Sequence, residues 1–298
     1  MRDTAPASPR PSTPFVKMHG LGNDFAVIDR RNADNGASAN GSAAALPEIG
    51  EGAARAIADR RTGVGCDQLI LIEPPQNPLA DVFMRIRNAD GGEVEACGNG
   101  ARCVAALLMA ETGRSHVVIE TVVGLLDAEA APDGRIGVDM GPARLDWREI
   151  PLAKPMDTLH LDLALGPLAD PVAVNVGNPH AVFFVPKAEA VDLARLGPEI
   201  ERHALFPERT NVEVATVLGP DRIRMRVWER GVGITRACGT GACATLVAAA
   251  RRKLTGRRAT VLLDGGELEI EWLPDDQVRM TGPATISFTG RLDASLLG

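Results

Sequence analysis

The chain has 298 residues, 45% of them hydrophobic and 24% charged, which is enough material for two globular domains. Its formal net charge of −7 argues against a nucleic-acid partner, because a protein that binds the phosphate backbone needs a basic face. No apolar run approaches the roughly 18 residues that a membrane helix requires, so no membrane partner is expected either.

The N-terminus lacks the apolar segment of a secretory signal and is rich in proline, serine and alanine. This composition predicts a disordered tail over residues 1–13. We therefore expect a cytoplasmic protein whose five cysteines stay reduced. Because none of them forms a Cys-x-x-Cys pair, no metal site is expected.

Strands outnumber helices in the pattern of the chain. Alternating and β-branched runs predict strands at 25–29, 68–72, 82–87, 117–121, 135–140, 172–176, 181–185, 212–217, 222–228, 260–263, 267–271 and 277–281. Helical runs are predicted at 48–61, 99–111, 189–204 and 241–254. Since helices and strands do not alternate regularly, the predicted fold class is α+β.

The sequence repeats itself once. Residues 84–97 read MRIRNADGGEVEAC and residues 225–238 read MRVWERGVGITRAC, and both runs continue into a glycine-rich turn and a run of small apolar residues. A weaker match upstream pairs GNDFAV at 22–27 with GNPHAV at 177–182. The repeat indicates two similar lobes, each carrying one Ala-Cys-Gly-x-Gly-Ala sequence.

Cys97 and Cys238 each precede a Gly-x-Gly turn that opens a predicted helix. The free N–H groups and positive dipole end of a helix lower the pKa of a thiol from about 8.5 and also bind carboxylates. A thiolate and a thiol facing each other could remove a proton from one face of a stereocentre and deliver one to the other, without a cofactor. Taken singly, either cysteine is as well explained as a small buried residue; the duplication favours catalysis.

The other three cysteines have no such pairing. Cys103 and Cys243 are interpreted as packing residues of their helices, and Cys66 lies two residues from Gln68, where a reactive extra thiol is conceivable. Residues 33–48 look like an insertion into a loop.

The repeated blocks resemble those of diaminopimelate epimerases over residues 15–290. The matching blocks are KMHGLGNDF (17–25), RRTGVGCDQL (60–69), NADGGEVEACGNGARC (88–103), VGNPHAV (176–182), ERTNVE (208–213) and WERGVGITRACGTGACA (228–244). Proline racemase-like and PhzF-like proteins share the fold of this family but not this full set of blocks.

The resemblance implies conversion of L,L-2,6-diaminopimelate to the meso form, which supplies lysine and peptidoglycan precursors. It also implies an isomerase that needs no cofactor such as PLP, a homodimer, and two pseudo-symmetric lobes. Each lobe would be a barrel-like, mostly antiparallel sheet around a central helix, with the active site in the cleft between the lobes. We expect residues 14–143 and 283–298 to form the lobe of Cys97, and residues 144–282 that of Cys238.

The resemblance makes Cys97 and Cys238 the catalytic pair, with Cys97 assigned to the L,L isomer. It implies that His180 and Glu229 tune the pKa of the thiols. The residues implied to bind substrate are Asn23, Gln68, Asn88, Gly98, Asn99, Asn178, Asn211, Glu229, Arg230, Gly239 and Thr240. Among them, the glycines and their neighbours at the helix starts would hold the reacting carboxylate.

At the far end of the substrate, Arg230 suits a second carboxylate because its planar guanidinium pairs bidentately. Phe288 stands where many relatives carry a tyrosine at the dimer contact, and the chain has no tyrosine. The expected dimer therefore lacks that phenolic hydrogen bond.

Two alternatives stay open. One is an epimerase or racemase of the same fold that acts on another amino acid, for which a clamp on a distal carboxylate would be unnecessary. The other is a dithiol redox protein that uses Cys97 and Cys238 as a disulfide-forming pair.

Overall fold

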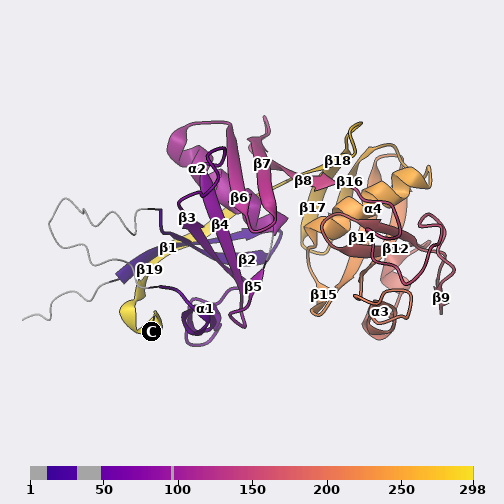
Figure 1. Ribbon diagram of the computed structural model, residues 1–298, viewed down its shortest axis with the longest axis horizontal. Helices are drawn as coiled ribbons and strands as arrows, with labels where there is room; N and C mark the ends of the chain where they lie inside the picture. The colour runs from indigo at the N-terminus through magenta and orange to yellow at the C-terminus, as the bar shows by residue number, and fades with distance from the viewer. Residues whose placement is uncertain (1–11, 32–47, 95–96, 298) are drawn as a thin grey trace, which may run out of the picture.

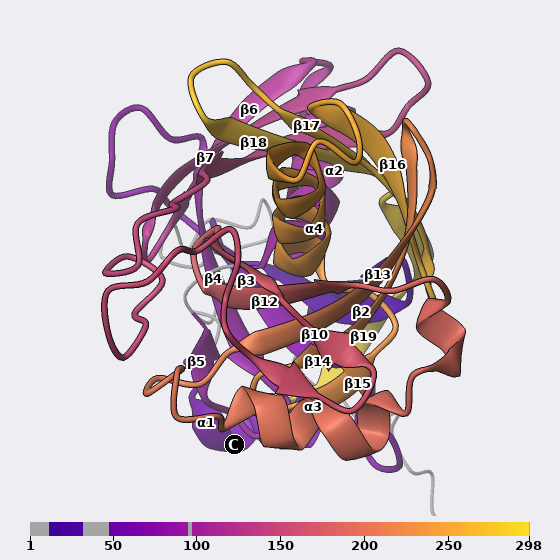
Figure 2. The ribbon, with the colours of Figure 1, turned by 90° about the vertical axis from the view of Figure 1, so that its right-hand side faces the viewer.

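The chain folds into two lobes that lie side by side (Figure 1). The computed structural model describes residues 12–31, 48–94 and 97–297. In each lobe a curved sheet wraps around one helix, α2 (Gly98–Thr112) in the first lobe and α4 (Gly239–Arg251) in the second. Figure 2 shows α4 enclosed by strands on several sides. The predicted α+β class with two lobes is thus confirmed.

The strands of the first lobe follow a simple order. They are β1 (Ser12–Gly20), β2 (Asn23–Asp29), β3 (Gln68–Glu73), β4 (Val82–Asn88), β5 (Glu93–Val94), β6 (His116–Thr121), β7 (Gly124–Ala130) and β8 (Ile136–Pro142). Neighbouring strands pair antiparallel, except that β2 pairs parallel with β3 and β4 parallel with β6. Helix α1 (Glu51–Ala58) lies between β2 and β3 in the chain.

The second lobe repeats this connectivity strand for strand. Its strands are β11 (Val172–Asn175), β12 (Pro179–Phe184), β13 (Asn211–Gly219), β14 (Arg222–Glu229), β15 (Gly233–Thr235), β16 (Arg258–Leu263), β17 (Gly266–Trp272) and β18 (Gln277–Gly282). Parallel pairs again join the second to the third strand and the fourth to the sixth. The sequence repeat is therefore a structural repeat, with helix α3 (Leu193–Glu201) in the place of α1.

The lobes join through their last strands. β8 pairs antiparallel with β18, with Val138 opposite Met280. After β8 the chain crosses to the second lobe, where Arg144 bridges to Asn175 of β11. After β18 it returns to the first lobe, where β19 (Thr285–Asp293) pairs with β1. The junction thereby places the starts of α2 and α4 close to the boundary between the lobes.

The two central helices are built of small residues because sheet surrounds them. Residues 241–249 of α4 are all buried, and so are residues 98–105 of α2. A helix that is apolar all round is typical of a fully enclosed position, and alanine, glycine and cysteine let strands approach it closely. Each helix lies in its own hydrophobic core.

Each strand and helix expected from the sequence is present, with ends that differ by a few residues. Five strands were not expected from the pattern of the sequence, namely β1, β5, β7, β15 and β19, and neither was the short hairpin of β9 (Ala164–Leu165) and β10 (Leu168–Ala169). β7 is rich in alanine, aspartate and glutamate, which are poor strand formers, and it forms because β6 and β8 pair with it on either side.

Some expectations fall outside the described residues. The predicted tail is described only from Ser12, and Ser12 and Thr13 already belong to β1. Of the insertion at 33–48, only Glu48 is described. In the part of the chain that the structure describes, no helix has the length and hydropathy needed to cross a membrane.

Candidate active site

Cys97 and Cys238 occupy the same position on α2 and α4. Each is the residue immediately before its helix and has an extended backbone, with φ of −147° at Cys97 and −127° at Cys238. Both thiols therefore lie beside the free N–H groups of a helix start, as the Gly-x-Gly turns predicted.

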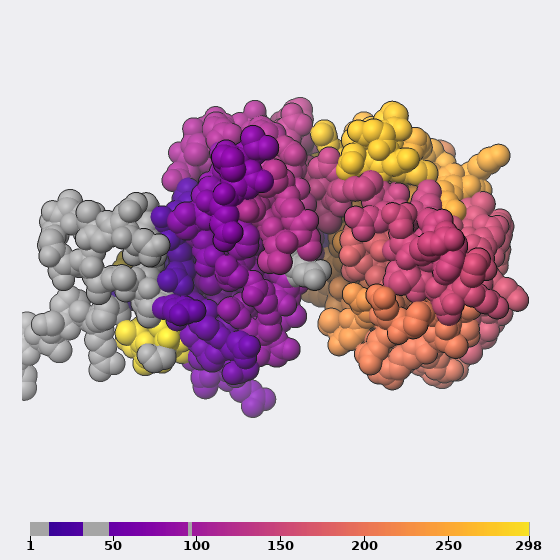
Figure 3. Space-filling model, viewed as in Figure 1, coloured from indigo at the N-terminus to yellow at the C-terminus, as the bar shows by residue number. Residues whose placement is uncertain are grey.

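The two helix starts meet at one side chain, Met280 of β18. A Cβ added at Gly98 would lie 2.6 Å from the methyl carbon of Met280, and one added at Gly239 would lie 2.9 Å from its sulfur. The Gly239 position is also 3.8 Å from Asn99 Oδ1. The first turns of α2 and α4 are thus brought together, and Figure 3 shows the surface indented between the two lobes.

Cys97 faces Asn23, the first residue of β2. Its thiol donates to Asn23 Oδ1 over 3.8 Å, and Asn99 Nδ2 donates to the same oxygen at 3.2 Å. Three residues expected around the reacting carbon therefore share one polar contact.

Cys238 has a different set of neighbours. Its sulfur accepts the backbone N–H of Gly241 at 3.4 Å and lies 3.5 Å from Thr240 Oγ1. Gly241 has no room for a side chain, because a Cβ there would lie 3.3 Å from the sulfur and 2.9 Å from Glu213 Oε1. The start of α4 is thus packed between the thiol and a carboxylate.

The expected direction of the thiol pKa values is wrong for both cysteines. Burial raises the pKa of Cys97 and that of Cys238, and the negative charge of Glu229 raises both further. The backbone N–H groups at the helix starts lower each thiol pKa, but by less than burial raises it. The helix dipole was correctly identified, and desolvation outweighs it.

A buried pair lies behind Cys238, in which His180 was expected from the sequence and Glu213 was not. Glu213 of β13 and His180 of β12 are both buried, with Oε1 2.7 Å from Nδ1, and His180 Nε2 lies 2.7 Å from Asn178 Oδ1. Burial raises the pKa of Glu213, while the charge and hydrogen bond of His180 oppose this. Alternation along β13 puts Glu213 on the same face as Asn211, a signal that could have identified it.

The remaining asparagines and Gln68 lie at equivalent strand ends of the two lobes. In the first lobe Gln68 Nε2 donates to Asn88 Oδ1 at 3.0 Å. In the second, Asn211 donates to Pro179 O at 2.9 Å and accepts the backbone N–H of Arg230 at 2.8 Å. Gln68 and Asn211 begin the third strand of their lobes, and Asn88 ends the fourth strand of the first lobe.

Glu229 and Arg230 are adjacent in sequence but have different surroundings. Glu229 is hydrogen-bonded by the Thr235 hydroxyl, and burial raises its pKa. Arg230 donates to Glu208 O at 3.1 Å and lines a cavity of about 320 Å³. Asn178 lines the same cavity, so two expected binding residues meet there.

The other cysteines are packing residues. Cys66, Cys103 and Cys243 are buried, and burial raises their thiol pKa values, to about 12 for Cys103 and Cys243. Cys66 packs in a separate core with α1 residues, so it is not a reactive extra thiol.

Known proteins resemble this chain over nearly its whole length. A family model described as diaminopimelate epimerase matches residues 15–145 and 172–287. A diaminopimelate epimerase of Rhodospirillum centenum is 60% identical over 283 residues, which cover 95% of this chain and 93% of the relative. One of Phenylobacterium zucineum is 55% identical, covering 94% of this chain and 97% of the relative.

Solved structures with the same fold are more distant in sequence. A phenazine biosynthesis protein of the PhzF family from Bacillus anthracis has a TM-score of 0.66 at 14% identity, covering 95% of this chain and 99% of that one. A hydroxyproline epimerase from Agrobacterium vitis, with bound trans-4-hydroxy-L-proline, has a TM-score of 0.63 at 16% identity, covering 94% and 92%. These structural likenesses establish the fold of the chain, and the chemistry must be argued from the residues of its own site.

Proposed function

The chain belongs to the diaminopimelate epimerase family and is an isomerase, and from that premise we propose that Cys97 and Cys238 interconvert L,L- and meso-diaminopimelate as a cofactor-free two-base pair. One observation supports the pair above all others. The helices that begin after the two cysteines have their first glycines against the same Met280 side chain. Two thiols at these starts can flank one substrate carbon.

In the proposed reaction, one cysteine acts as base and the other as acid. Starting from the L,L isomer, the Cys97 thiolate takes the α-proton and becomes a thiol. The Cys238 thiol delivers its proton to the opposite face of the same carbon and becomes a thiolate. The reverse direction exchanges these roles, so that one proton is removed and one added in each turnover.

Because the thiol pKa values are raised in the free protein, we expect bound substrate to contribute to thiolate formation. The N–H groups of Gly98–Asn99 and Gly239–Thr240 would hold the reacting carboxylate at the two helix starts. The substrate's α-ammonium group then brings a positive charge close to both sulfurs, and a nearby positive charge favours a thiolate. Substrate binding thus supplies part of the activation that the helix starts alone do not.

The distal end of the substrate would lie toward Arg230. Its guanidinium suits the second carboxylate, and the remaining binding roles fall on Asn23, Gln68, Asn88, Asn178, Asn211 and Glu229. His180 and Glu229 would tune the thiols: Glu229 acts on both, and His180 acts through its contact with Glu213.

We test the substrate by α-proton exchange into deuterated water with a panel of amino acids. Diaminopimelate should exchange, and monocarboxylic amino acids should not, because they leave Arg230 without a partner. Exchange of proline without exchange of diaminopimelate would contradict the substrate assignment.

We test the cysteine pair with Cys97→Ala and Cys238→Ala. Each should reduce epimerisation by ~10²–10⁴-fold, the range for loss of a general acid or base. Cys66→Ala is the matched control and should keep its activity, because Cys66 packs in a separate core. Full activity in either of the first two variants would exclude the two-base mechanism.

We further propose a cytoplasmic homodimer, with lobes of 14–143 plus 283–298 and of 144–282. The dimer contact would form on the face of β1 and β19. There Phe288 packs edge-to-face on Phe15 with ring centroids 5.9 Å apart, and it remains 50% exposed. Ile286 on the same strand is 54% exposed, which supports an apolar contact.

A further inference from the structure

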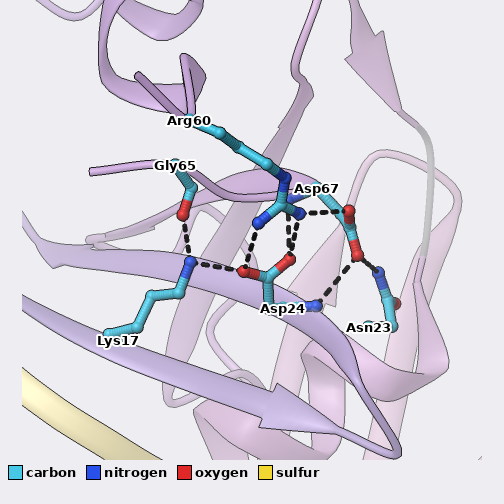
Figure 4. A network of polar contacts seen from close by, with 6 residues as sticks. All are labelled: Lys17, Asn23, Asp24, Arg60, Gly65 and Asp67. Atoms are coloured by element: carbon cyan, nitrogen blue, oxygen red, sulfur yellow. Dashed lines mark hydrogen bonds and ion pairs between the residues drawn. The ribbon is translucent and has the colours of Figure 1, made fainter. Parts of the chain in front are cut away.

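A chain of hydrogen bonds runs from the junction of the lobes to the surface of the first lobe. Arg102, fully buried in α2, donates from Nη2 to Asn99 Oδ1 at 2.8 Å. Asn99 Nδ2 donates to Asn23 Oδ1 at 3.2 Å, and Asn23 Nδ2 donates to Asp67 Oδ2 at 3.1 Å. Figure 4 shows the outer end of this chain, where Arg60 holds Asp67.

Arg102 and Asp67, at the two ends of this chain of hydrogen bonds, fix the direction in which each bond is donated. A guanidinium can only donate hydrogen bonds, and a carboxylate can only accept them. An asparagine amide has one end of each kind, so Asn99 must turn its oxygen to Arg102 and its nitrogen to Asn23. Asn23 must then turn its nitrogen to Asp67. In this orientation its oxygen also faces the Cys97 thiol, 3.8 Å away.

We propose that Arg102 and Asp67 are positioning residues that lock both asparagine amides, so that Asn23 presents an oxygen, never an N–H, to Cys97. The proposal rests on the catalytic role of Cys97 given above. An acceptor in this place holds the thiol proton along a fixed direction when Cys97 is the acid. A turned amide would instead donate to the sulfur and stabilise the thiolate.

Several hydrogen bonds and ion pairs hold the outer end of this chain of hydrogen bonds in place. Asp67 accepts from Arg60 Nη2 at 2.7 Å and from the backbone N–H of Asp24 at 3.1 Å. Arg60 also donates to Asp24 at 2.7 Å, and Lys17 pairs with Asp24 (Figure 4). Burial alone would raise the pKa of Asp24, but the hydrogen bonds from Arg60 and Lys17 hold it well below its usual range.

Other groups also act on Cys97 and must stay constant in a test. Glu229 raises its pKa, while Arg102 and the backbone N–H groups of Gly100 and Asn99 lower it. A change at Asp67 leaves all of these in place. Asp67 is not one of these groups, whereas a change at Arg102 would remove one of them.

The test is Asp67→Asn, read out as the pH dependence of Cys97 alkylation. The positive Arg60 keeps the oxygen of the new amide turned to itself, so the new NH₂ group faces the NH₂ group of Asn23. Asn23 then meets an NH₂ group whichever way it lies, that of the new side chain in its present orientation or that of Asn99 when turned over. Its orientation is no longer fixed, and the turned form donates to the Cys97 sulfur. We expect the midpoint of Cys97 carbamidomethylation by iodoacetamide to move to lower pH, by on the order of one unit.

The measurement uses the full chain and mass spectrometry of its peptides. Trypsin cuts after Arg102 and so separates Cys97 from Cys103. The matched control is Glu267→Gln, which breaks an exposed ion pair with Arg222 in the other lobe and should not move the midpoint. Circular dichroism establishes that each variant is folded.

A second variant tests the direction of the chain. In Arg60→Gln/Asp67→Asn the charge that orients the new amide is gone, so that amide can offer its oxygen to Asn23. The midpoint should then return to the wild-type value. An Asp67→Asn midpoint equal to that of the Glu267→Gln control, or moved to higher pH, would overturn the proposal.

Alkylation does not depend on turnover, so the two proposals can fail separately. A shifted midpoint in a protein whose Cys97→Ala variant keeps full activity would leave the amide chain intact and remove the role of Cys97. An unmoved midpoint with inactive Cys97→Ala would do the reverse.

Discussion

At the scale of single residues, the two thiols are equivalent in position and different in environment. Cys97 donates to the oxygen of Asn23, whereas Cys238 accepts from the backbone of Gly241. Glu213 and Glu229 both raise the pKa of Cys238, whereas Glu229 is the carboxylate that raises that of Cys97. The two copies of the motif thus give their thiols different hydrogen-bond partners and different neighbouring charges. This difference suits an enzyme whose two substrate isomers differ.

Glu229→Gln tests the electrostatic part of this description. The thiol pKa values are raised above the ordinary range, so the thiolate fraction, and with it the rate, should increase as the pH rises. Removing the charge of Glu229 lowers both thiol pKa values, and the acidic limb of the kcat/KM profile should move to lower pH.

The full profile should be bell-shaped, since one thiol must be charged and the other neutral, and its limbs report the pair. An acidic limb that stays in place in Glu229→Gln, or moves to higher pH, would show that this carboxylate does not tune the thiols.

The residue types at the site were readable from the sequence because the cysteines, glycines and asparagines come in matched blocks. The sign of the thiol pKa shift was not, since it depends on how deeply the helix starts are buried. Glu213 was missed for a related reason. A glutamate in a strand is usually exposed, and only the tertiary fold shows its buried contact with His180.

At the scale of elements, the start of α4 depends on a residue without a side chain. Gly241 lies between the Cys238 sulfur and Glu213, at distances that leave no room for a methyl group. The glycine thus allows the helix N–H groups to approach the thiol.

Gly241→Ala should therefore displace Cys238 or Glu213 and lower kcat. Overpacking of this kind typically costs about 1–3 kcal/mol of stability, measurable by thermal unfolding. Gly52→Ala in α1 is the matched control, because nothing lies within 4 Å of its added Cβ. The control should keep its activity and its stability; a Gly241→Ala enzyme with wild-type kcat would show that the close packing is dispensable.

Helices and buried strands were predictable because their hydrophobic periods are strong and are repeated. The strands that were missed depend on their neighbours. β19 is exposed along most of its length and forms because β1 supplies its hydrogen bonds. The pairing of two strands about 270 residues apart cannot be predicted from the local pattern of either strand.

At the scale of the whole molecule, the segment that follows the last strand of each lobe pairs with a strand of the other lobe. Arg144 bridges to Asn175 after β8, and β19 pairs with β1 after β18. The pairing of β8 with β18 holds the lobes together where the helix starts meet. The site is therefore a product of the duplication, since neither lobe alone contains both cysteines.

The exposed face of β19 carries a prediction about assembly. Phe288→Glu places a charge beside Ile286, so it should convert a dimer to monomers in light scattering while leaving circular dichroism unchanged. Leu79→Glu, at a leucine that is 73% exposed in the loop between β3 and β4, is the control and should remain dimeric. A wild-type protein that is monomeric at micromolar concentration would contradict the proposed dimer.

The two-base arrangement is tested most directly by a crystal structure with a bound diaminopimelate analogue. The quantity to measure is the distance from each of the two sulfurs, Cys97 Sγ and Cys238 Sγ, to the α-carbon. We expect about 3–3.5 Å for each, from opposite faces of that carbon. The mechanism would be contradicted by a complex in which both sulfurs lie on one face of the α-carbon, or in which either sulfur points into the core of its own lobe.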